Sequence, residues 1–228
     1  MYPVASSLLS ARDALRVGRL AALALALGLA CVGQVVAQVR IGQPSGFTGA
    51  VSAGVKENTA GAKLYLDEVN RKGGVHGQTI ELITGDDEFK PARTPEVARE
   101  LVDKHGVIAL FLNRGTPHTE ALLPFLAERG IPLVAPSTGA MVLHQPVNRW
   151  VFNVRATYQR EAAKAIEHLA SLGMTRIAVL QTDDSFGADS AVGAAAGFEK
   201  AGLKPVWLVK FPRDNPDFAL AAKQAVEA

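Results

Sequence analysis

The chain has 228 residues and carries 24 Lys and Arg against 22 Asp and Glu. Three of the Arg and one of the Asp lie in the first 37 residues, so residues 38–228 hold 21 charges of each sign and are formally neutral. A neutral segment gives no electrostatic argument for binding to nucleic acid or to an acidic membrane surface. The single cysteine, Cys31, leaves residues 38–228 without a disulfide, a thiol nucleophile or a cysteine metal site.

The first 37 residues have the pattern of a secretory signal. Arginines precede an apolar run over 20–32, and small residues then lead to Ala37. As a helix, this run is too short to cross the hydrocarbon core of a bilayer. We expect a signal peptide over 1–37 that is cleaved after Ala37, and a periplasmic mature protein. The alternative is a lipoprotein signal, in which Cys31 would carry the lipid.

From residue 38 onward, short β-rich runs alternate with amphipathic segments. Strands are expected over 39–41, 79–83, 107–112 and 131–134, and helices over a segment ending near residue 70, over 95–104 and over 117–129. The run over 107–112 is continuously apolar and is expected to be fully buried. Strands of this kind, separated by helices, indicate an α/β fold whose parallel sheet is covered on both faces.

The pattern changes between 145 and 156, where Pro146 and Asn148 interrupt it before an expected strand over 150–154. The alternation then restarts, with helices expected over 161–172, 189–201 and 217–227 and strands over 176–180 and 206–209. We therefore divide the chain into an N-terminal lobe, 38–146, and a crossover with a partial second lobe, 147–228. A parallel unit needs a strand after its helix, so the final helix predicts an incomplete second lobe in a C-terminally truncated chain.

Five sequence blocks occur in order along the chain. They are Asn70-Arg71-Lys72-Gly73-Gly74-Val75-His76-Gly77 with Asp86-Asp87; Arg114-Gly115-Thr116-Pro117-His118-Thr119; Pro136-Ser137-Thr138-Gly139-Ala140; Phe152-Asn153-Val154-Arg155-Ala156-Thr157-Tyr158; and Asp184-Ser185-Phe186-Gly187. Together they resemble the leucine/isoleucine/valine-type periplasmic binding proteins, the substrate-binding components of branched-chain amino acid ABC transporters. The resemblance implies a type I periplasmic binding protein fold, in which two Rossmann-like lobes with parallel sheets hold a ligand between them.

The ends of the predicted strands carry the first candidate ligand-binding residues. Gly115 and Thr116 precede a helix at the carboxyl edge of the sheet, where open α/β sheets bind ligands and free helix N–H groups attract a carboxylate. The resemblance implies that the hydroxyl at Thr116 binds the carboxylate of the ligand; an ordinary helix cap is the alternative. Ser137, Thr138 and Gly139 follow the next strand, and the resemblance implies main-chain and hydroxyl contacts to the polar end of an amino acid.

Aromatic residues are candidates for covering the ligand. The resemblance implies this role for Phe186, against the alternative of core packing. Tyr158 and Phe47 are further candidates of the same kind. No cofactor or metal is expected, because the histidines lack metal-ligand spacing. The pair Asp86-Asp87 is interpreted as a solvated loop or as acceptors for nearby backbone N–H groups.

These features favour ligand binding over catalysis. The sequence has neither a G-x-S-x-G nor a G-x-G-x-x-G motif, which disfavours an α/β hydrolase or a dinucleotide-binding enzyme. We expect an exported solute-binding protein that holds an amino acid or a similar small carboxylate and whose partner is the membrane permease of an ABC importer. A sensory module of the same fold, which feeds a signalling partner, is the alternative.

Overall fold

The computed structural model describes residues 38–214 and 216–227. The predicted signal peptide, its cleavage after Ala37 and the alternative lipid site at Cys31 lie outside the described residues. Among the helices that are described, none combines the length and the apolar composition needed to span a membrane.

The first unit is a parallel sheet with three α-helices. Its strands are β1 (Gln38–Ser45), β2 (Thr79–Asp86), β3 (Ala109–Phe111), β4 (Leu133–Val134) and β5 (Val151–Phe152). Its helices are α2 (Ser52–Arg71), α3 (Thr94–His105) and α4 (Thr116–Arg129), followed by the short 3-10 helix η1 (Met141–Leu143). All the strand pairings are parallel, in the order β2-β1-β3-β4-β5, which confirms the predicted α/β class.

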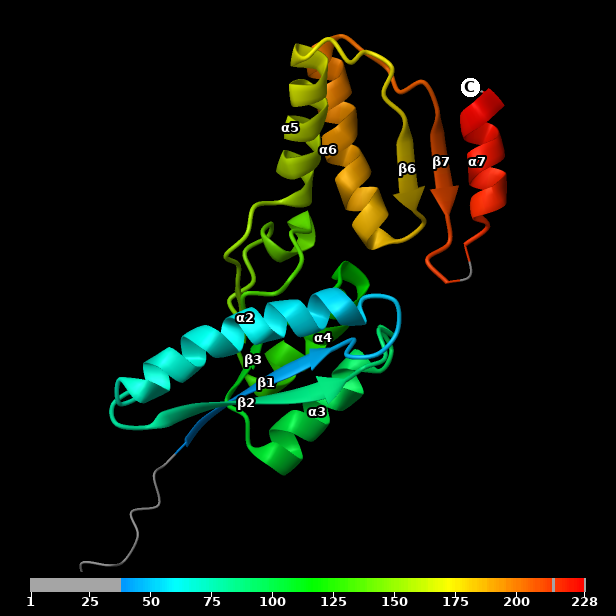
Figure 1. Ribbon diagram of the computed structural model, residues 1–228. Helices are drawn as coiled ribbons and strands as arrows, with labels where there is room; N and C mark the ends of the chain where they lie inside the picture. The colour runs from blue at the N-terminus through cyan, green and yellow to red at the C-terminus, as the bar shows by residue number, and fades with distance from the viewer. Residues whose placement is uncertain (1–37, 215, 228) are drawn as a thin grey trace, which may run out of the picture. The chain divides into compact units, whose positions relative to one another are not determined.

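The order of the strands determines which helix lies on which face. The chain crosses the sheet in one direction from β1 to β2 and in the other direction from β2 through β3 to β4. Because crossovers between parallel strands are right-handed, α2 lies on one face, and α3 and α4 lie on the opposite face. Figure 1 shows α2 and α3 on opposite sides of β1 and β2.

The main core lies between the sheet and the helices α3 and α4. Leu110 and Leu133 of the sheet and Leu122 and Leu126 of α4 are completely buried in it. Burial of each such side chain stabilises the fold by roughly 1.5–3 kcal/mol relative to exposure. The prediction that 107–112 is fully buried was wrong: only Val107 and Leu110 are buried, Ala109, Phe111 and Leu112 are half-buried, and Ile108, which precedes β3 at the amino edge of the sheet, is 63% exposed.

The second unit has a two-stranded parallel sheet and three helices. Its elements are α5 (Tyr158–Ser171), β6 (Val179–Thr182), α6 (Ser185–Ala201), β7 (Leu208–Phe211) and α7 (Phe218–Glu227). Both strands begin two or three residues later and end two residues later than predicted, since their pairing runs from Val179 with Leu208 to Thr182 with Phe211. The division of the chain at residue 146 stays a prediction; β5 lies just beyond it and pairs with β4 of the first sheet.

Glycines allow α5 and α6 to pack closely. A Cβ atom on Gly193 would lie 2.1 Å from the carbonyl oxygen of Gln159, and one on Gly197 would lie 2.8 Å from that of Ala163. Contacts below 3.0 Å are not tolerated by real Cβ atoms, so these helix positions require glycine.

Candidate functional site

A cavity of about 290 Å³ lies at the carboxyl end of the first sheet. Its lining comes from residues of both units: Val51, Asn58, Phe89, Arg114, Gly115, Thr116, Ser137, Arg155, Tyr158, Phe186 and Arg213. Grooves of about 380 and 390 Å³ lie beside β6, but mostly apolar side chains line them. The smaller cavity offers far more of the polar groups that orient a small ligand, and we take it as the candidate site.

The loops after β3 and β4 run side by side into this cavity. Leu112 and Ala135, the residues that follow the two strands, have φ values of 54° and 52°, so the chain leaves both strands through a left-handed residue. The N–H of Ser137 then donates to the carbonyl of Asn113 over 2.7 Å, and Arg114 forms a parallel bridge with Ser137. The main chain therefore holds Arg114 and Ser137 next to each other.

The start of α4 offers donors that no side chain of the helix uses. The N-cap is Gly115 with φ 102°, the helix has no side-chain cap, and its first turn contains no acidic residue. Thr116 is 1% exposed, and its hydroxyl is 2.7 Å from that of the buried Thr138. One hydrogen bond uses one of the two hydroxyl protons, so the pair still has a donor. Thr116 is therefore not the ordinary cap that was the alternative.

Gly139 and Tyr158 connect the first unit to α5. The N–H of Tyr158 donates to the carbonyl of Gly139 over 2.8 Å, and a Cβ atom on Gly139 would lie 2.4 Å from the carbonyl oxygen of Ala156. Gly139 therefore permits a close approach of two chain segments and is not part of the cavity lining, and neither is Thr138. The rings of Tyr158 and Phe186 meet edge to face, with centroids 4.9 Å apart, and both line the cavity.

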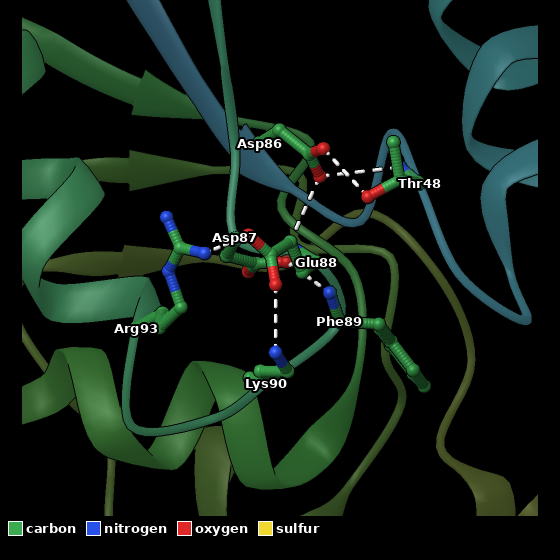
Figure 2. Close-up of polar contacts among 7 residues, drawn as sticks. All are labelled: Thr48, Asp86, Asp87, Glu88, Phe89, Lys90 and Arg93. Carbon is green, nitrogen blue, oxygen red and sulfur yellow. Dashed lines mark hydrogen bonds and ion pairs between the residues drawn. The ribbon is translucent and has the colours of Figure 1, made fainter.

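Asp86 ties the loop after β1 to the loop after β2, as Figure 2 shows. Its carboxylate accepts from the Thr48 N–H at 3.2 Å, from the Thr48 hydroxyl at 2.7 Å and from the Glu88 N–H at 2.9 Å. These bonds match the interpretation of Asp86 as an acceptor for backbone N–H groups. Phe47, in the same first loop, is half-buried and lies outside the cavity lining.

The buried Asp87 positions an aromatic ring that the sequence analysis did not single out. Its carboxylate accepts from the Phe89 N–H at 2.9 Å and from the Thr94 hydroxyl at 2.7 Å (Figure 2 shows the first of these bonds). Phe89 has φ 55°, a backbone conformation that is costly for a non-glycine residue and persists only where its surroundings enforce it. Its ring stacks on His118 at 4.1 Å and forms part of the cavity wall.

His118 and Asp87 form a buried titratable pair beneath the cavity. Burial lowers the pKa of His118, against the opposing effects of the Phe89 backbone and of the Asp87 carboxylate. The charges near it are those of Asp87, Arg213 and Asp184. Burial also raises the pKa of Asp87, against the opposing effects of the Thr94 hydrogen bond and of His118. His118 is therefore a neutral packing residue at pH 7 rather than a ligand-binding cation.

Three arginines line the cavity, and the sequence analysis named none of them as a site residue. Arg155 pairs with Glu161 at 2.6 Å, and Arg213 pairs with Asp184 at 2.5 Å. Burial of Asp184 acts to raise its pKa, but hydrogen bonds from Arg213 and the Gly187 N–H outweigh it and hold the pKa below its ordinary value. Arg114 could have been identified, because it directly precedes Gly115 after a buried strand; Arg213 follows β7 with no such signal.

The structure thus brings five of the eight predicted site residues to one cavity: Gly115, Thr116, Ser137, Tyr158 and Phe186. Their role in ligand binding stays a prediction. Within the described residues, no group of three or more His, Cys, Asp or Glu side chains could hold a metal ion.

Relatives are found both among sequences and among solved structures. The "Amino acid binding protein" of Pseudomonas aeruginosa is 27% identical over 191 residues, which cover 82% of this chain and 51% of that protein. The "Leu/Ile/Val-binding protein homolog 6" of Brucella abortus is 28% identical over 185 residues, which cover 79% of this chain and 46% of that protein. A substrate-binding periplasmic protein from Ralstonia solanacearum has a TM-score of 0.76 at 31% identity, over 83% of this chain and 54% of that chain.

The chain spans about half the length of these relatives. The fold of the Ralstonia protein is the type I periplasmic binding fold expected from the sequence. Members of this family bind substrates and are not enzymes. The family model described as "Periplasmic binding protein" matches residues 38–228, and the chain therefore belongs to the periplasmic binding protein family.

Proposed function

We propose that the chain is the ligand-binding part of an extracytoplasmic solute-binding protein that serves an ABC importer. The ligand is an amino acid or a similar small carboxylate, held in the cavity at the carboxyl end of the first sheet. The names of the Pseudomonas and Brucella relatives, which refer to amino acids, support this class of ligand.

The observation that carries the proposal is that hydrogen-bond donors at the start of α4 have no partner within the helix. The first N–H groups of a helix have no partner within the helix, and α4 supplies neither a side-chain cap nor an acid in its first turn. The hydroxyl pair of Thr116 and Thr138 adds one free proton, and Ser137 adds a further hydroxyl from the cavity wall. A carboxylate at this point would accept several hydrogen bonds at the positive end of the helix.

The role of Thr116 is tested by its replacement with valine, which removes the hydroxyl and keeps the branched shape. A hydrogen bond to a charged group contributes about 1.5–3 kcal/mol, so Thr116→Val should weaken binding by roughly 10- to 150-fold. Thr59→Val is the matched control, because Thr59 is also buried but its hydroxyl donates to Gln43 and Val55 away from the cavity. Calorimetric titration with leucine, phenylalanine and small carboxylates measures both variants. Equal affinities of Thr116→Val and the wild-type protein would remove Thr116 from the site.

Export and transport need separate experiments. We propose cleavage after Ala37 and a periplasmic mature protein, and intact-mass analysis of the exported chain should show a start at Gln38. A lipid on Cys31 would instead place the protein on a membrane.

Loss of uptake of the identified ligand after deletion of the gene would support a role in an ABC importer. Unchanged uptake, with loss of a ligand-induced response, would favour the sensory alternative.

A further inference from the structure

Positive charge dominates the wall of the candidate site. Arg114, Arg155 and Arg213 line the cavity, and its described lining includes no Asp or Glu. Two of these arginines pair with carboxylates that lie outside the lining: Arg155 with Glu161, and Arg213 with Asp184. One guanidinium charge, that of Arg114, therefore has no matching carboxylate in the described part of the chain.

The surroundings of Arg114 add to this positive charge. A Cβ atom on Gly54 would lie 3.0 Å from Nη1 of Arg114, so the guanidinium rests against the first turn of α2. That helix has no side-chain cap and no acidic residue in its first turn. A guanidinium beside the positive end of a helix is repelled, and an anion that contacts the guanidinium from the cavity would be attracted to both.

Charge complementarity then separates two classes of ligand. A neutral amino acid is a zwitterion, and its ammonium group would lie close to the guanidinium groups on the described wall of the cavity. A ligand with a net negative charge would supply the carboxylate that Arg114 lacks. Arginine and carboxylate groups pair through two parallel hydrogen bonds, which gives geometric selectivity as well as affinity.

We propose that the ligand of this site carries a net negative charge, as an organic acid without an amino group or an acidic amino acid does, and that Arg114 pairs with its acidic group. The proposal rests on the proposed function, because it names the ligand class of the same cavity. It makes Arg114 a specificity-determining residue, and it gives Gly54 the role of leaving room for the guanidinium.

Two pairs of ligands of matched shape test the charge of the ligand. Glutamate and glutamine differ by one negative charge, and 4-methylpentanoate and leucine differ by the ammonium group. Titration calorimetry of the purified chain at low salt should show that the anionic member of each pair binds at least about tenfold more tightly. Measurement at high salt should reduce this preference.

Variants then test whether Arg114 causes the preference. Arg114→Gln should remove most of it, and Arg99→Gln should leave it unchanged, because Arg99 lies on α3 outside the cavity lining and pairs with Glu128 at 3.6 Å. Gly54→Ala places a Cβ atom 3.0 Å from Nη1, so the guanidinium should shift by a few tenths of an ångström and the preference should fall less than in Arg114→Gln. Gly61→Ala, in the same helix and with no atom within 4 Å of the added Cβ, is its control.

The outcomes distinguish the two proposals. Equal or tighter binding of glutamine and leucine than of their anionic partners would overturn the charge proposal and leave the binding function standing. A preference for anions that survives in Arg114→Gln would also overturn it. Binding of none of the four compounds would remove the proposed function and this inference together.

Discussion

The buried hydroxyl pair at the start of α4 provides a quantitative test of the site's architecture. Thr116 and Thr138 are 1% and 0% exposed, and each hydroxyl is the other's only hydrogen-bond partner among the described side chains. Thr116→Val leaves the Thr138 hydroxyl buried without a partner, and Thr138→Val does the same to Thr116. Each single change should lower the free energy of unfolding by about 1–3 kcal/mol, the cost of an unsatisfied buried polar group.

The double variant is the informative measurement. With both hydroxyls replaced by methyl groups no polar atom of the pair is left unsatisfied, and such paired replacement is close to neutral. The double variant should therefore be about as stable as the wild-type protein, so the coupling energy should nearly equal the sum of the two single losses, roughly 2–6 kcal/mol.

Urea unfolding of the four proteins without ligand gives these free energies by linear extrapolation, provided that the slopes agree among them. Additivity of the two single losses within about 0.5 kcal/mol would refute the reasoning, because it would mean that the two hydroxyls do not depend on each other.

Three further perturbations follow from the packing and the charges. Gly193→Ala should destabilise the second unit by about 1–3 kcal/mol in thermal unfolding, because its Cβ would overlap the Gln159 carbonyl. The control Gly61→Ala should be neutral or stabilising by up to ~1 kcal/mol. Equal effects of the two changes would contradict the close packing of α5 against α6. Burial lowers the pKa of His118, so the unfolded chain takes up the proton first, and the wild-type protein should lose stability as the pH falls below about 6.5, by up to ~1.4 kcal/mol per pH unit more than His118→Gln. Parallel profiles of the two proteins between about pH 5 and 7 would exclude a role for His118. Asp184→Ala should lower the free energy of unfolding in urea by about 0.5–2 kcal/mol, because it removes the N-cap of α6. Asp184→Asn keeps a capping oxygen and should retain most of that stability. Equal losses in the two variants would mean that the ion pair with Arg213 dominates.

Local signals in the sequence explain why the order of the elements could be predicted. Apolar runs separated by amphipathic segments gave the alternation of strands and helices. In the structure, Gly106, Gly130 and Gly202 follow α3, α4 and α6 in the left-handed conformation. Such signals depend on residues close together in the chain, so they can be recognised in the sequence without knowledge of the tertiary structure.

The candidate site could be predicted only in part. Gly115, Thr116 and Ser137 were accessible from the sequence, because parallel strands end at a common edge and these residues follow such strands. Phe89 was not accessible, since it reaches the cavity through a left-handed backbone that the buried Asp87 supports. Phe47 lies outside the lining of this cavity, because proximity to a strand end does not fix where a ring points.

The sequence by itself determined the parallel α/β class, the order of the elements and the residues at the ends of β3 and β4, because each depends on local pattern. Only the tertiary structure decided the electrostatics of the cavity, since Arg114 and Arg213 come from segments about a hundred residues apart in the sequence. It also decided which arginines are already neutralised, because Glu161 and Asp184 become partners only after folding. The charge of the cavity wall is a property of that assembled set of residues, and no local pattern in the sequence contains it.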